Sequence, residues 1–121
     1  MKYDSKITSW GKDAIKLFKE LNYLIIFNDD APPELAEISI LHEKAPLYGN
    51  ILKGDTFIIG EKIFDVTAIG NEAYNTFKEL GHATLNFSGE NKAPLPGHIV
   101  LYGNIPLLEK DIQKGIRINI Y

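Results

Sequence analysis

The sequence predicts a mainly β fold, a single-domain closed or nearly closed β-barrel or sandwich of about eight short strands with two short helices. Apolar and polar residues alternate in short runs that end at Gly, Pro, Asn or Asp. Only two segments space their apolar residues as a helix does. With 121 residues the chain can bury one core, and a sheet of short strands hides its edges most economically by closing on itself.

The first half of the chain predicts three strands and one helix. Residues 3–10 alternate loosely, whereas residues 13–21 place their apolar side chains on one helical face. The β-branched and aromatic run 23–27 predicts a buried strand. Prolines make residues 31–36 a loop with room for one helical turn, and the apolar run 38–41 is a strand that ends at His42.

The second half predicts a hairpin, a helix and three further strands. The hairpin has a tight turn at Gly60-Glu61, and Asn71 and Gly81 bound the helix as N-cap and C-terminal stop. We see no internal repeat, and the aromatic residues expected in the core are Trp10, Tyr23, Phe27, Phe57, Phe64, Phe77 and Phe87. The predicted elements are strands 56–59, 62–69, 82–87, 98–102 and 115–121 and a helix over 72–80.

Composition excludes several classes of function. The absence of cysteine excludes disulfides, thiolate metal sites and cysteine nucleophiles. A net charge of −3, from 13 basic and 16 acidic residues spread along the chain, does not indicate a basic surface for binding nucleic acid. The charged N-terminus is followed by no long apolar run, so we expect no signal peptide, no membrane insertion and a cytoplasmic location.

His42 is the leading candidate nucleophile. Neutral imidazole is reactive near pH 7, whereas the hydroxyl groups of the chain need an activating base. A strand end fixes the backbone, and we expect the side chain there to reach solvent and a partner. Residue type alone favours an ordinary surface or half-buried histidine at a strand end.

Three blocks of sequence and a Pro-Gly pair indicate a protein family as well as a fold class. They resemble the glucitol/sorbitol-specific IIA component of the phosphoenolpyruvate-dependent sugar phosphotransferase system, in order and in spacing, from about Ile7 to the C-terminus. The blocks are residues 26–35, His42 with residues 47–49, Gly54 and Gly60, residues 66–70 through 79–89, and Pro96-Gly97.

The resemblance implies a phosphoryl relay. The histidine-containing phosphocarrier protein gives its phosphoryl group to a histidine of the IIA protein, which passes it to the IIB domain of a sugar-alcohol permease. The family's phosphorylated histidine matches His42, and no cofactor or metal is implied. Residues 43–46 depart from the family pattern, which puts the partner surface and the sugar in doubt. A homodimer is compatible with the sequence.

The surroundings of His42 follow as expectations from the residues nearby. Backbone N–H groups near Gly49 or Gly81, the Lys44 ammonium and the His82 ring are candidate donors to the phosphoryl oxygens. His82 either contacts or orients the phosphoryl site, or is a structural histidine bound to a backbone carbonyl. A transient partner patch is expected from Leu41, Ala45, Pro46, Leu47 and Tyr48.

Two other functions stay open at this point. A non-catalytic binding or regulatory module that keeps the fold without the relay is compatible with the altered residues 43–46. A small metal-dependent hydrolase that uses His42 and His82 ranks last, because three dispersed histidines offer no short metal-ligand spacing. His98 matches no family histidine and is expected on the surface.

Overall fold

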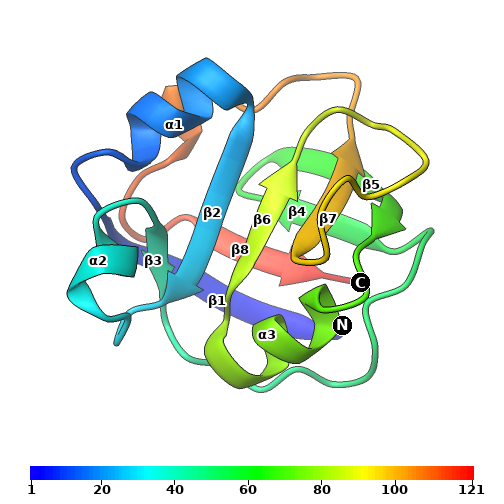
Figure 1. The fold of residues 1–121 in the computed structure, drawn as a ribbon, viewed down its shortest axis with the longest axis horizontal. Coiled ribbons are helices and arrows are strands. Elements are labelled where there is room, and N and C mark those ends of the chain that lie inside the picture. The colour runs from blue at the N-terminus through cyan, green and yellow to red at the C-terminus, as the bar shows by residue number, and fades with distance from the viewer.

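The computed structural model describes all 121 residues, and its eight strands close into a barrel (Figure 1). Around the barrel the strands follow the order β1-β3-β2-β6-β7-β5-β4-β8, with parallel pairing only in β2–β3 and β6–β7. The elements are β1 (Tyr3–Trp10), α1 (Ala14–Leu21), β2 (Tyr23–Asn28), α2 (Pro33–Ala36), β3 (Ile40–His42), β4 (Thr56–Ile59), β5 (Lys62–Ile69), α3 (Ala73–Leu80), β6 (Ala83–Asn86), β7 (His98–Tyr102), the short 3₁₀ helix η1 (Glu109–Asp111) and β8 (Arg117–Ile120).

The predicted fold class is confirmed, and most predicted elements fall within two residues of the observed ones. The single turn at Pro33 is the short helix α2, and η1 adds a 3₁₀ turn that the apolar spacing did not predict. The proposed cap at Asn71 is wrong, because Glu72 is the N-cap and no side chain bonds there. The placement of Trp10 in the core is also wrong, because 40% of its surface is exposed at the end of β1.

The structure contains an internal repeat, contrary to the expectation from sequence. In β1 and β3, Ile7 lies opposite His42 and a bulge then shifts the register by one residue. In β5 and β7, Val66 lies opposite Leu101, and the same bulge follows at the corresponding place. Both pairs are related by one offset of 59 residues, the difference between Ile7 and Val66. Each half is therefore a β-α-β-β unit with the same hydrogen-bonded register.

The same offset relates the two main helices and their ends. Residues 18–21 and 77–80 are both Phe-Lys-Glu-Leu, and the residue that follows each helix is left-handed, Asn22 at φ 59° and Gly81 at φ 62°. A left-handed residue at this position lets the backbone N–H cap the helix and turn into the next strand. The repeat therefore preserves backbone geometry more than residue identity.

The two units meet at the antiparallel pair β2–β6. Ile25 lies opposite Thr84, and these two residues are themselves equivalent under the offset, so the pseudo-twofold axis passes between them. Because β2 and β6 are antiparallel, α1 and α3 lie at opposite ends of the pair (Figure 1). Each end of the barrel thus presents one copy of the same local architecture.

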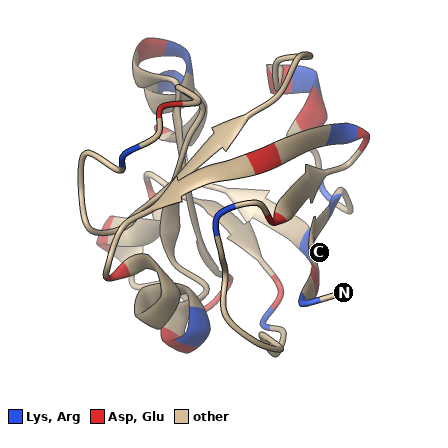
Figure 2. Ribbon diagram, turned by 90° about the vertical axis from the view of Figure 1, so that its right-hand side faces the viewer, with Lys and Arg blue, Asp and Glu red and all other residues tan.

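The barrel interior holds one cluster of 22 buried hydrophobic residues contributed by all eight strands and by both main helices. Side chains alternate between this core and the outside along the longer strands, as in the β5 sequence from Lys62 to Ile69. Lysines and arginines are interspersed with aspartates and glutamates on the outside (Figure 2). None of the helices combines the length and apolar character needed to cross a bilayer.

Candidate active site around His42

The alternation of β3 places His42 inside the barrel. Ile40 and His42 point inward and Leu41 points outward, and His42 has no exposed surface. The expectation that the ring reaches solvent is therefore wrong for this conformation. Strand β3 lies between β1 and β2, so the sheet on both sides fixes the backbone that carries the ring.

The Nδ1 side of the ring faces strand β1 and the residue after β3. Tyr3 Oη lies 3.2 Å from Nδ1, Ser5 Oγ lies 3.3 Å away and the carbonyl oxygen of Glu43 lies 3.1 Å away. The Ser5 hydroxyl donates to the same Glu43 carbonyl at 2.7 Å. Burial raises the pKa of Tyr3 to about 12, with a smaller opposing effect of its hydrogen bond to Ser5, so its hydroxyl stays protonated. Nδ1 is held by three neighbours.

The Nε2 side faces the left-handed turn that ends helix α3. The carbonyl oxygen of Gly81 lies 2.8 Å from Nε2, the shortest contact that either ring nitrogen makes. The Phe77 ring, from the last turns of the same helix, stacks nearly parallel to the imidazole at a centroid distance of 6.3 Å. The end of α3 therefore covers the Nε2 edge of the ring.

These contacts define two neutral tautomers of His42. With the proton on Nε2, the ring donates to Gly81 and accepts a hydrogen bond from Tyr3 at Nδ1. With the proton on Nδ1, it donates to the Glu43 carbonyl and leaves a lone pair on Nε2. Burial lowers the pKa of His42, although the carbonyls of Gly81 and Glu43 and the charge of Asp29 oppose this shift. The ring is thus held neutral at pH 7.

Asn28 completes the site beside the Nε2 edge. It lies opposite His42 in the parallel pair β2–β3, and its side-chain Oδ1 is buried without a hydrogen-bond partner. A Cβ atom built on Gly81 would overlap Asn28 Oδ1 and lie 2.8 Å from His42 Cε1. Asn28, Gly81 and His42 therefore meet at one point, and only glycine fits there.

The other expected donors are placed differently. His82 Nδ1 lies 3.1 Å from the Ile26 carbonyl, which fits the structural alternative, and its ring packs against Phe27 instead of His42. The Gly81 N–H is bonded to Phe77, so this turn presents its carbonyl to the site. Lys44 is exposed, and its ammonium lies 2.6 Å from the Asp30 carboxylate, which raises the pKa of Lys44. A Cβ atom built on Gly49 would have no neighbour within 4 Å, so this turn borders open space.

His98 was expected on the surface, and the structure buries it. It retains 3% of its surface on strand β7, where Asn86 Nδ2 lies 3.2 Å from its Nδ1 and the Tyr23 ring meets it edge-on at 4.9 Å. Burial lowers its pKa. Position 98 is related by the repeat to Ser39, which is also buried. The place of His98 in the fold therefore explains its burial, which its residue type did not indicate.

The expected partner patch is only partly a surface. Pro46 and Tyr48 are exposed, the latter with 68% of its surface. Ala45 and Leu47 are half-buried and pack against the core, and Leu41 is half-buried as well. A charge at Leu47 therefore threatens packing as well as any partner contact.

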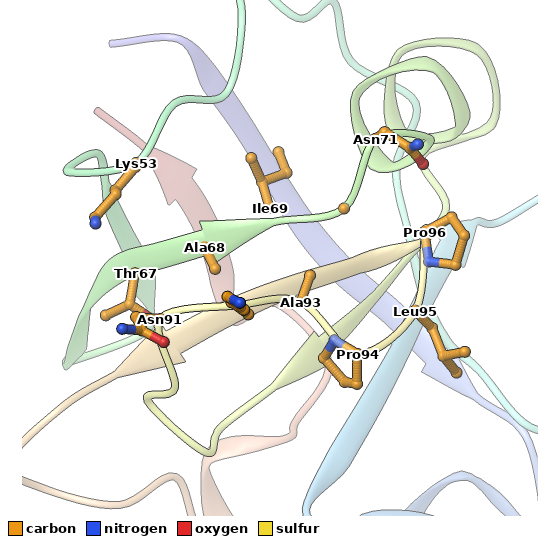
Figure 3. Close-up of a pocket in the computed structure, with 12 residues that line it drawn as sticks. Lys53, Thr67, Ala68, Ile69, Asn71, Asn91, Ala93, Pro94, Leu95 and Pro96 are labelled. Carbon is orange, nitrogen blue, oxygen red and sulfur yellow. The ribbon is translucent and has the colours of Figure 1, made fainter.

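None of the surface pockets includes His42. The largest, about 610 Å³, lies between the end of β5 and the loop 91–96 (Figure 3). Lys53, Asn71 and Asn91 contribute polar groups to it, and Pro94 and Leu95 of the loop are among its lining residues. It is an open groove on the second copy of the repeat, remote from the buried imidazole.

The repeat also supplies the matching position in the second copy. Leu101 stands where the first copy has His42, Phe87 where it has Asn28 and Phe64 where it has Ser5. The Phe64 and Phe87 rings pack edge-on at 5.2 Å, and Leu101 is fully buried. The positions of His42, Ser5 and Asn28 are thus polar in the first copy and apolar in the second, whereas the position of Tyr3 holds Lys62. Alignment of the sequence with itself at an offset of 59 residues would have indicated this difference between the two copies.

Known proteins match this chain over nearly its full length. Residues 2–118 match the profile of the family described as the PTS system glucitol/sorbitol-specific IIA component. The glucitol/sorbitol-specific EIIA component of Escherichia coli (strain K12) is 36% identical over 113 residues, which cover 93% of this chain and 89% of that protein. The corresponding component of Shigella flexneri matches with the same identity and coverage.

The fold also occurs in a solved structure. A PTS system IIA component from Enterococcus faecalis V583 superposes with a TM-score of 0.75 over 97% of this chain and 98% of that one, at 18% sequence identity. That likeness concerns the fold alone. The family profile and the two relatives at 36% identity show that this chain belongs to the glucitol/sorbitol-specific IIA components of the sugar phosphotransferase system.

Proposed function

We propose that this chain, as one IIA domain over residues 1–121, carries a phosphoryl group on His42. It receives the group from the histidine-containing phosphocarrier protein and passes it to the IIB domain of a sugar-alcohol permease, in the cytoplasm. Family membership supports a phosphocarrier role in general. The assignment to His42 rests on the buried polar cluster described above.

One observation carries the assignment. The fold fills the position of His42 with Leu101 and its apolar neighbours in the second copy, so stability does not require polar groups there. Burying an imidazole, a tyrosine hydroxyl and an unpaired carboxamide costs free energy that the apolar solution avoids. Such a cost is characteristic of a site that performs chemistry.

We assign the attacking atom to Nε2. Three neighbours surround Nδ1, whereas Nε2 has a single carbonyl contact from a turn next to exposed residues of α3. In the tautomer with a proton on Nδ1, the Glu43 carbonyl accepts that proton's hydrogen bond, and Nε2 carries the lone pair that attacks once the Gly81 carbonyl has moved. A neutral ring is required for attack, and burial keeps the ring neutral.

The transfer exchanges one P–N bond for another. The Nε2 lone pair of His42 forms a bond to phosphorus as the P–N bond of the donor's phosphohistidine breaks, and the donor ring, protonated on its other nitrogen, takes that electron pair and leaves as neutral imidazole. The proton on His42 Nδ1 stays in place and balances part of the added negative charge. Because the bond made and the bond broken are alike, the step is readily reversible, as a relay requires.

Access to Nε2 requires a local rearrangement. The Gly81 carbonyl lies where an incoming phosphoryl group must approach, so the turn between α3 and β6 has to move its oxygen away. Glycine at φ 62° tolerates such a change of backbone angles better than any other residue. The buried conformation thus represents the resting state, and partner docking at the end of α3 opens it.

The test is a phosphorylation assay with the purified chain. Incubated with phosphoenolpyruvate, the first enzyme of the relay and the histidine-containing carrier, the wild-type chain should gain an acid-labile, base-stable label, and His42→Ala should gain none. His82→Ala should retain the label, because that ring binds the Ile26 carbonyl. An unlabelled wild-type chain would instead support a regulatory module without the relay, and label that survives His42→Ala would show that another residue carries the phosphoryl group.

A further inference from the structure

We propose that the side chain of Asn28 is a catalytic residue that contacts the phosphoryl group while it resides on His42. This inference rests on the proposed function. Asn28 lies within the block of residues 26–35 that resembles the family, and the resemblance gives it no role. The structure adds that Asn28 lies next to His42 in β2–β3 and meets Gly81 at the Nε2 edge of the ring.

The state of the carboxamide is the first argument. Asn28 retains only 9% of its exposed surface, and its Oδ1 is the one buried side-chain oxygen or nitrogen without a hydrogen-bond partner. Folded proteins satisfy nearly all such groups, so an orphan needs an explanation. One explanation is that the Asn28 carboxamide gains a hydrogen-bond partner only in another state of the protein.

The position of the carboxamide is the second argument. Oδ1 and His42 Cε1 both lie against the point where a Gly81 Cβ would stand. Cε1 lies between the two ring nitrogens, and the carbonyl oxygen of the same Gly81 faces Nε2, so a phosphoryl group on Nε2 extends beside this point. Movement of the Gly81 carbonyl then leaves Asn28 as the polar side chain that already faces the new group.

The chemistry of the carboxamide is the third argument. Rotation by a half turn about the last side-chain bond exchanges Oδ1 with Nδ2 and leaves the rest of the residue in place. With Oδ1 toward the ring, Asn28 is compatible with the tautomer that carries a proton on Nε2. With Nδ2 toward the ring, it donates to a phosphoryl oxygen, where fixed donors stabilise the charge of the transferring group. One residue can thus serve both states.

The second copy of the repeat separates this role from a structural one. Phe87 occupies the position equivalent to Asn28, half-buried against the core. The fold therefore accepts an apolar side chain at this position. Asn28→Leu should consequently fold as well as the wild type, with an unchanged or higher melting temperature, because it removes an orphaned oxygen.

The experiment compares initial rates of phosphorylation and the half-life of the phosphorylated form in Asn28→Leu, Asn28→Asp and the matched control Phe87→Leu. We expect Asn28→Leu to be phosphorylated about tenfold or more slowly, in line with the loss of one fixed donor. Asn28→Asp should gain no label, because its carboxylate repels the phosphoryl group. Phe87→Leu should keep the wild-type rate per folded molecule, and Asn28→Ser, which restores a donor, should recover part of it.

The outcomes distinguish the two proposals. A labelled wild type with Asn28→Leu within twofold of its rate and half-life would overturn the role of Asn28 and leave the relay intact. Unfolding of both Asn28→Leu and Asn28→Ser would also overturn it, by showing that the carboxamide is structural. An unlabelled wild type would overturn the proposed function itself, and the role of Asn28 with it.

Discussion

The two copies of the β-α-β-β unit have the same backbone arrangement but different side chains around the equivalent positions of His42 and Leu101. Around Leu101 the second copy uses Phe64 and Phe87, whose aromatic rings pack together. Around His42 the first copy uses Tyr3, Ser5 and Asn28, of which Asn28 keeps an unpaired oxygen. Backbone register, helix length and the left-handed cap are shared. The difference therefore separates what the barrel needs from what the site needs.

The comparison also explains why the sheet tolerates a buried histidine. The strands that carry His42 and Leu101 have equivalent pairing partners, with a bulge at the same place. The backbone hydrogen bonds that stabilise the barrel therefore do not depend on either side chain. Most of the stability resides in the shared apolar cluster. Polar groups can thus accumulate at one end of the barrel without loss of the fold.

The largest effect on stability is expected in the apolar copy. Leu101→Ala should lower the free energy of unfolding by about 2–5 kcal/mol, because it leaves a cavity among rigid aromatic rings. Urea denaturation followed by circular dichroism measures this change. Phosphorylation per folded molecule should persist, since the lesion lies in the other copy. Loss of labelling in folded Leu101→Ala would break the proposed separation of the two copies.

The two left-handed caps give a sharper contrast. Asn22→Ala should cost about 1 kcal/mol, the penalty of a left-handed alanine. Gly81→Ala should cost about 3 kcal/mol, because the added methyl group also overlaps Asn28 and crowds His42. Thermal unfolding of both variants provides the measurement. Equal costs at the two caps would mean that the contact among Gly81, Asn28 and His42 is looser than described.

These contrasts show how far sequence reasoning reached. Alternation and helical spacing predicted about eight strands, two helices and a closed or nearly closed barrel or sandwich, because those patterns reflect which side of the backbone meets the core. The structure is a closed barrel. His42 was predicted as the reactive group, a role that the phosphorylation assay still has to test. Its burial was missed, although the alternation Ile40-Leu41-His42 already put the ring on the same face as Ile40.

The remaining errors share a physical cause. The repeat escaped notice because the two copies keep backbone geometry while their core residues change, as His42 and Leu101 illustrate. His98 was expected outside because histidine is often exposed, whereas its strand has both faces covered at that point. The contact of Asn28 with Gly81 joins residues distant in sequence, so no local pattern indicates it.

The pH dependence of stability tests the buried histidines. Burial lowers the pKa of His42 and of His98, so the unfolded chain binds protons at a pH where the folded chain does not. Stability is therefore complete above about pH 6.5 and falls as the pH drops below it, by at most about 1.4 kcal/mol per pH unit for each histidine. Urea midpoints between pH 7.5 and 5 measure the slope. His42→Gln should flatten it, and an unchanged slope would show that His42 is not buried neutral.

The smallest effect is expected at Lys44, whose equivalent in the second copy is Gly103. Its ammonium is exposed and already paired with Asp30, and screening by solvent makes such a pair weak. Lys44→Ala should leave the melting temperature unchanged and reduce the rate of phosphorylation only slightly. A large fall in that rate would identify Lys44 as a phosphoryl or partner contact. The functional site of the first copy would then include this exposed residue.

Long-range ¹H–¹⁵N spectra of the three histidine rings, recorded before and after enzymatic phosphorylation, test the central claim most directly. The account predicts that only His42 changes, that its Nε2 becomes coupled to ³¹P, and that its Nδ1 keeps a proton bonded to Glu43. Phosphorus coupling at His42 Nδ1, or at His82 or His98, would contradict it, as would spectra in which no ring changes.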